Sequence, residues 1–137
     1  MKHLFIINPI AGKGNAIRCK EIIEKYFEDK DDYYEIITTE RPEEATDVVK
    51  NYDYSEECKV YSVGGDGTLN EVINGLIGKN ASLGIIPAGS GNDFVRSYLD
   101  DSDLSNIIKD TIEGESKEVD VGCINDRYFI NISAIGF

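Results

Sequence analysis

Residues 60–72 read VYSVGGDGTLNEV, and this stretch decides the fold of the chain. Val60 to Val63 are mostly residues that favour β-strands, which is typical of a short buried strand. A glycine turn follows at Gly64 to Gly67. The apolar spacing after the turn predicts a helix from Thr68 to about Ile77. Glycines leave room for a ligand and allow backbone N–H groups to close on phosphate oxygens. The stretch therefore predicts a strand, a ligand-binding turn and a helix in succession.

The same succession occurs on both sides of this stretch. A buried strand at Leu4 to Ile7 ends at Asn8 and Pro9, and the apolar spacing after Gly14 predicts a helix that ends near Phe27. Further strands are predicted at Tyr34 to Thr38 and at Leu83 to Ile86, and Pro42 is typical of a helix start. The predicted buried positions of the two helices are Cys19, Ile22, Ile23, Tyr26 and Phe27, and Ala45, Val48, Val49 and Tyr52.

Strands that alternate with helices predict an α/β fold, a three-layer structure with a mostly parallel sheet between flanking helices. The pattern changes at the end, where Val119, Val121 and Cys123 alternate with polar residues and Asn125 and Asp126 indicate a turn. Tyr128 to Ile132 would then return as an antiparallel partner strand. At 137 residues, the chain is expected to form one domain over residues 1–137.

The amino-acid composition excludes several classes of partner and site. The net charge is −12, from 14 Lys and Arg against 26 Asp and Glu, so nucleic acid is an unsuitable partner. A phosphorylated ligand is compatible with this charge only if backbone N–H groups and helix N-termini bind it. The three cysteines are far apart and suggest neither a disulfide framework nor a zinc site, which fits a reducing cytoplasm. No apolar stretch approaches the length of a membrane span.

Three glycine turns follow buried strands, and their convergence carries the functional argument. Besides Gly64 to Gly67 there are turns at Asn8 to Gly14 and at Pro87 to Phe94. Strand ends of a parallel sheet share one edge, where ligands bind. The first turn is not a Walker A motif, because Asn15 and Ala16 follow Gly12-Lys13-Gly14. A plain turn is the alternative for the central motif, since Thr68 and Glu71 have the spacing of a capping box.

Other residues receive no catalytic assignment. His3 is the only histidine, it stands at a strand start, and no nucleophile or metal ligand lies at meaningful spacing, so it is interpreted as structural. The acidic stretches at Glu28 to Asp32 and at Asp100 to Asp103 are interpreted as solvated surface.

The segments Asn8 to Gly14, Gly64 to Gly75 and Pro87 to Arg96 resemble the motifs of the diacylglycerol kinase catalytic domain family, which includes sphingosine and ceramide kinases and bacterial lipid kinases. The resemblance implies the N-terminal domain fold shared with NAD kinases. It also implies ATP and Mg²⁺ as cofactors, transfer of the γ-phosphoryl group to a lipid hydroxyl, and Asp66 as the catalytic carboxylate. The nucleotide site that it implies comprises Asn8, Pro9, Ile10, Ala11, Gly12, Thr39, Gly65, Asp66, Gly67, Thr68, Leu69, Asn70, Glu71 and Ser90; no residue is assigned as a metal ligand.

Further expectations come with the resemblance. A β-rich domain beyond Phe137 would supply the lipid pocket, further magnesium ligands and the base, so the chain alone is expected to be inactive. The protein is expected in the cytoplasm, with peripheral membrane contact left open. An exposed strand edge at Tyr128 to Ile130 invites pairing with a second copy, so a homodimer is also expected. Two alternatives remain open: a kinase for a soluble substrate, similar to NAD kinases, and a non-catalytic nucleotide-binding module.

Overall fold

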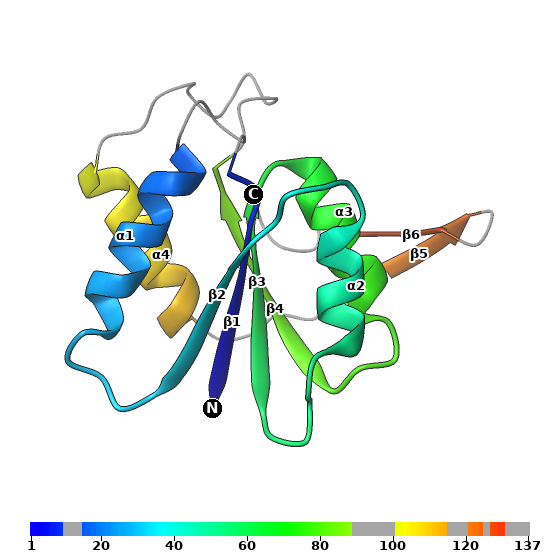
Figure 1. The fold of residues 1–137 in the computed structure, drawn as a ribbon, viewed down its shortest axis with the longest axis horizontal. Helices are drawn as coiled ribbons and strands as arrows, with labels where there is room; N and C mark the ends of the chain where they lie inside the picture. Colours follow the sequence, from blue (N-terminus) through cyan, green and yellow to red (C-terminus); the bar gives the residue numbers. More distant parts are fainter. Residues whose placement is uncertain (10–14, 89–100, 115–120, 125–126, 131–137) are drawn as a thin grey trace.

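The computed structural model describes residues 1–9, 15–88, 101–114, 121–124 and 127–130. Four parallel strands form the central sheet in the order β2-β1-β3-β4, and helices cover both faces (Figure 1). The elements of this part are β1 (Lys2–Ile7), α1 (Asn15–Phe27), β2 (Tyr33–Thr38), α2 (Glu44–Asn51), β3 (Cys58–Gly64), α3 (Asp66–Leu76), β4 (Ala81–Pro87), α4 (Asp101–Glu113), β5 (Val121–Ile124) and β6 (Arg127–Ile130). The predicted three-layer α/β fold is confirmed.

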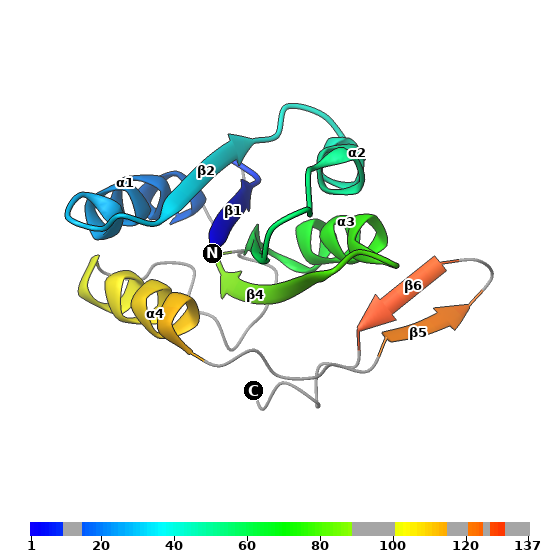
Figure 2. The ribbon, with the colours of Figure 1, turned by 90° about the horizontal axis from the view of Figure 1, so that it is seen from below.

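Side chains of β1 alternate between the two faces of the sheet, as the period of a strand requires. Phe5 and Ile7 pack with buried residues of α1 and α4, whereas Leu4 and Ile6 pack with buried residues of α2 and α3. Figure 2 shows the two helix pairs on opposite sides of the sheet. β1 and β3 are buried on both faces. Apolar residues are continuous from Leu4 to Ile7 in β1, whereas Lys59 and Ser62 interrupt them in β3.

The helices bury the faces that the sequence predicts. In α1, Cys19, Ile23 and Phe27 are buried, and in α2, Ala45 and Val49 are buried. The other predicted positions of these two helices are partly buried and pack on the same two clusters: Ile22, Tyr26, Val48 and Tyr52.

Two predicted helix starts are wrong. The first helical residue of α3 is Asp66 rather than Thr68, with Gly65 as the N-cap. Thr68 is therefore inside the helix, and the capping box predicted for Thr68 and Glu71 is not formed. Likewise α2 begins at Glu44 and not at Pro42, because Glu43 takes a left-handed backbone conformation with φ of 68° and ends the preceding turn.

The helix α4 was not predicted. It lies beside α1 and packs on β4, with Leu104 and Ile108 fully buried. The acidic stretch that was interpreted as surface runs into its first turn.

The C-terminal hairpin is confirmed as an antiparallel pair of β5 and β6, with Val121 opposite Ile130. It lies beside α3 (Figure 1). Val119, the turn at Asn125 and Asp126, and the predicted extension to Ile132 lie outside the described residues.

Candidate functional site

The carboxyl ends of the four parallel strands form one row, and the predicted site lies along it. Thr39 N donates to Ile7 O (2.9 Å), Asn8 N donates to Val63 O (3.2 Å), and Ala88 N donates to Gly64 O (3.0 Å). The sheet register thus continues one residue past the strands. Thr39, Asn8, Gly65 and Ala88 consequently follow one another along this edge in the strand order β2-β1-β3-β4.

The glycine turn at the centre of the row is held by a close contact. A Cβ atom on Gly64 would lie 2.7 Å from Thr68 Oγ1 and 3.1 Å from Thr68 Cβ, which is too close for any side chain. Thr68 is buried behind this contact, with 5% of its surface exposed. The turn is therefore folded tightly back on the first turn of α3.

The start of α3 is open to ligand. Leu69 N donates to Gly65 O (3.1 Å), which is the first turn of the helix, so the N–H groups of the three preceding residues have no partner within the helix. The N-cap is Gly65, which has no side chain to satisfy them. A Cβ atom on Gly67 would meet no atom of the described part of the chain within 4 Å, and Asp66 and Gly67 are exposed. An anion can reach this terminus and gain from the helix dipole.

The predicted site residues around α3 divide into two groups. Asp66, Gly67 and Asn70 are exposed, and Gly65 and Glu71 are partly exposed. Leu69 is 7% exposed and belongs to a small apolar cluster with Ile73, so its side chain serves packing. Glu71 accepts a hydrogen bond from Thr46 Oγ1 of α2 through its backbone carbonyl (2.7 Å).

The first strand end brings Asn8 and Pro9 to the same edge, both partly exposed. Thr39 is almost buried, and its hydroxyl donates to Ile7 O (3.3 Å). The predicted site residues that follow β1, β2 and β3 therefore lie at the same edge of the sheet. The predicted binding residues Ile10, Ala11, Gly12 and Ser90 lie outside the described residues.

Sequence reasoning missed Asn15, the first residue of α1. Its side chain is 1% exposed, and its Oδ1 accepts a hydrogen bond from Arg18 (2.8 Å). Its amide nitrogen finds no acceptor within the described part of the chain. No sequence signal marks this residue, because an asparagine at a helix start is ordinarily a cap.

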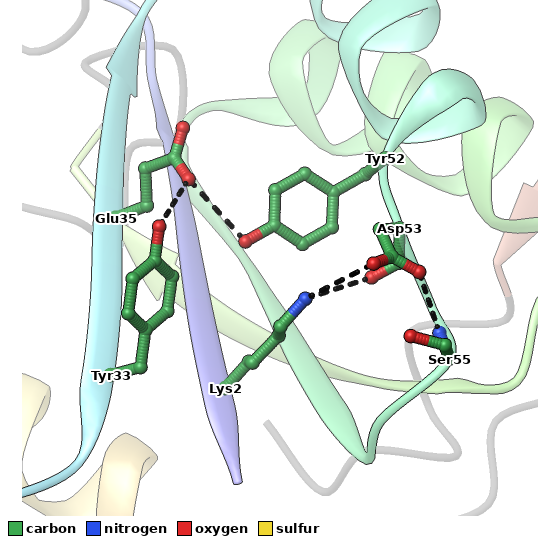
Figure 3. Close-up of polar contacts among 6 residues, drawn as sticks. All are labelled: Lys2, Tyr33, Glu35, Tyr52, Asp53 and Ser55. Atoms are coloured by element: carbon green, nitrogen blue, oxygen red, sulfur yellow. Dashed lines mark hydrogen bonds and ion pairs between the residues drawn. The ribbon is translucent and has the colours of Figure 1, made fainter.

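Polar contacts join side chains near the opposite edge of the sheet (Figure 3). The Glu35 carboxylate accepts from the hydroxyls of Tyr33 (3.2 Å) and Tyr52 (3.4 Å). Burial and the nearby Glu35 charge raise the pKa of Tyr52 above its usual range. Lys2 Nζ lies 3.8 Å from Asp53 Oδ2, and in this ion pair Asp53 is exposed and Lys2 is partly buried. These groups join the ends of β1, β2 and α2 and are interpreted as structural.

A buried pair links β1 and β3 near this edge. His3 Nδ1 and Tyr61 Oη are 2.7 Å apart, and both side chains are buried. Burial lowers the pKa of His3, although the Asp32 carboxylate opposes that shift. The interpretation of His3 as a structural residue agrees with its position in the core. Among the described residues, three or more His, Cys, Asp and Glu side chains nowhere gather as a metal site would require.

Comparison with known proteins shows which family the sequence and the fold resemble. The family model described as "Diacylglycerol kinase catalytic domain" matches residues 2–124. A diacylglycerol kinase of Staphylococcus saprophyticus is 47% identical over 96 residues, which are 69% of this chain and 30% of that protein. One from Staphylococcus aureus strain JH9 is 45% identical over 89 residues, covering 64% of this chain and 27% of the relative.

A crystal structure of a diacylglycerol kinase from Bacillus anthracis strain Sterne superimposes with a TM-score of 0.65 at 30% identity. The match covers 93% of this chain and 47% of that one. The chain thus spans less than a third of the two curated relatives and about half of the solved structure. No helix within the described ranges is long and apolar enough to cross a membrane.

Proposed function

The chain belongs to the diacylglycerol kinase catalytic domain family, and on that premise we propose that it is the ATP-binding part of a lipid kinase. The reaction would move the γ-phosphoryl group of ATP to a hydroxyl of diacylglycerol or a related lipid. Because the chain spans less than a third of the curated relatives, this activity is proposed for the full-length protein. The chain alone is expected to be inactive.

One observation carries the proposal, namely the open N-terminus of α3 behind the Gly64–Gly65 turn. The uncapped N–H groups there suit phosphate oxygens, and among the described residues a Cβ atom on Gly67 would have no neighbour within 4 Å. The contact between Gly64 and Thr68 fixes the turn before any ligand arrives. A preformed set of donors costs little reorganisation on binding.

The exposed Asp66 carboxylate suits a nucleotide that carries Mg²⁺. It stands in the first turn of α3, and the partly exposed Glu71 lies one turn further along. Bound ATP would supply the phosphoryl group, and its Mg²⁺ would neutralise charge during transfer. Asp66 would hold the cation beside the phosphates, while the α3 amides would hold the phosphate oxygens. Positioning of this kind supplies most of the catalysis in phosphoryl transfer.

A phosphorylation assay tests the proposal. The full-length protein is incubated with radiolabelled ATP, Mg²⁺ and vesicles of mixed lipids, and in parallel with soluble acceptors such as NAD. We expect label in a lipid, and a loss of at least about a hundredfold for Asp66→Ala, since removing one electrostatic contact to the transferring group typically costs this much. Asp110→Ala is the matched control, because Asp110 is an exposed carboxylate on α4.

The outcomes are distinct. Label in a lipid that depends on Asp66 but not on Asp110 supports the lipid kinase. Label in NAD instead would replace it with a kinase for a soluble substrate. The absence of any labelled product beside measurable ATP binding would favour a non-catalytic nucleotide-binding module.

A further inference from the structure

The turn between β2 and α2 is closed by the side chain of Glu44. Its Oε1 accepts hydrogen bonds from the backbone N–H groups of Glu40 (2.6 Å) and Arg41 (3.2 Å). Glu44 N in turn approaches Arg41 O at 3.4 Å. These two hydrogen bonds fix the turn at the start of α2, and together they are called the Glu44 clamp.

This turn needs such a clamp. Glu43 has φ of 68°, a left-handed conformation that is costly for a residue with a side chain. As the N-cap of α2, Glu43 makes no side-chain hydrogen bond to the helix. The usual means of fixing a helix start is thus not used, and the hydrogen bonds of the Glu44 carboxylate take its place.

The clamped turn adjoins the candidate site. Thr39 immediately precedes Glu40, and both its N–H and its hydroxyl are bonded to Ile7 O at the carboxyl edge of the sheet. The turn is therefore attached directly to a residue that is held against β1. An error of about 1 Å in a binding group is enough to weaken binding and catalysis severely.

The Glu44 clamp also makes the N-terminus of α2 differ from that of α3 in its ability to bind an anion. Both α2 and α3 begin where parallel strands end, and both attract anions through their dipoles. Near the α2 start, the Glu44 carboxylate already occupies two backbone donors, the N–H groups of Glu40 and Arg41. The α3 start is capped by a glycine. A phosphate group is consequently repelled from α2 and admitted at α3.

We propose that Glu44 is a positioning residue for the nucleotide: it fixes the turn beside Thr39 and directs phosphate groups to the start of α3. This inference rests on the proposed function, since it assumes that ATP binds at this edge. Glu44 itself is not required to touch the nucleotide.

Steady-state kinetics of the full-length kinase test the inference. We expect Glu44→Ala to raise the KM for ATP about tenfold, with kcat within about twofold of the wild type, because the chemical groups at α3 are untouched. Glu44→Gln keeps an oxygen acceptor but loses the charge, so its KM should rise only about threefold. Glu40→Gln is the matched control. It removes the same charge from the same turn without removing a clamp, and its KM should stay within about twofold.

A purely structural role for Glu44 predicts different data. Loss of folded enzyme would lower kcat and leave the KM for ATP unchanged, and that result in Glu44→Ala overturns the inference. If Glu44→Ala does not fold, Glu44→Gln decides: a KM equal to that of Glu40→Gln overturns it. A wild-type protein that is not saturated by ATP would instead refute the proposed function and not the role of Glu44 alone.

Discussion

Thr68 lies so close to Gly64 that a Cβ atom at Gly64 would be 2.7 Å from the Thr68 hydroxyl oxygen. This contact joins the end of β3 to the first turn of α3, and it explains why a glycine is required there. It also brings the Gly65 and Asp66 backbone to the open start of the helix. The central part of the candidate site is thus fixed by a packing contact.

Gly64→Ala is expected to destabilise the protein by about 1–3 kcal/mol, the usual cost of forcing an extra methyl group into a packed site. Thr68→Ala removes the hydroxyl oxygen, the atom nearest to the added methyl group, and leaves Thr68 Cβ at 3.1 Å, so the double variant should be more stable than the sum of the single effects predicts. Chemical denaturation of the four proteins measures this coupling. If the two substitutions change the free energy of unfolding by strictly additive amounts, the contact between Gly64 and Thr68 is contradicted.

Gly67→Ala, in contrast to Gly64→Ala, is expected to weaken ATP binding without lowering stability. A Cβ atom at this position meets no described residue within 4 Å, and alanine favours the helix more than glycine does, so thermal stability should be unchanged or slightly raised. The same methyl group would enter the space proposed for the phosphates, and we expect ATP affinity to fall at least about tenfold. Calorimetric titration with ATP and Mg²⁺ checks the second effect. An unchanged affinity for ATP would show that ATP does not bind on the Gly67 side of the turn.

The alternation of strands and helices and the parallel pairing could be predicted from sequence, because a buried strand such as Leu4 to Ile7 leaves a continuous apolar run. Val60 to Val63 departs from such a run at Ser62 alone, and the glycine turn after it is encoded locally. The alignment of strand ends at one edge followed from parallel topology alone, without knowledge of any side chain.

Other features depend on contacts that sequence does not display. Thr68 and Glu71 match a capping box, but the glycine turn starts the helix two residues earlier. The role of Glu44 depends on the left-handed conformation of Glu43, which no rule for glutamate predicts. The helix α4 was missed because its first turn is acidic, although acidic residues are favourable at a helix start and Leu104 and Ile108 have helical spacing.

Lys59 is predicted to hold the end of α4 on the sheet. Its side chain is buried, and Nζ donates to Thr111 O (2.6 Å) and Gly114 O (3.3 Å). Burial lowers the pKa of Lys59, and its ammonium group suits the negative end of the helix dipole. Lys59→Met should therefore lower the free energy of unfolding by about 1–3 kcal/mol. Lys109→Met, an exposed change on the same helix, is the control and should have little effect.

Stability should depend on pH through His3. Burial lowers its pKa below the ordinary value of 6.5, so the unfolded chain binds a proton more readily than the folded one. The contribution is fully present above the unfolded pKa and is lost as pH falls below it. His3→Gln should therefore show a smaller decrease in the urea midpoint than the wild type between about pH 7 and pH 5. Parallel decreases for the two proteins would assign the pH dependence to other groups.

The central claim is that ATP binds where the strands end, at the start of α3, and hydrogen–deuterium exchange of the full-length protein tests it most directly. With saturating ATP and Mg²⁺, we predict slower exchange in peptides that cover residues 64–71 and 39–46. Peptides from the opposite edge, at residues 30–35, should not change. Slower exchange confined to that opposite edge, or none near residues 64–71 at saturation, would contradict the claim.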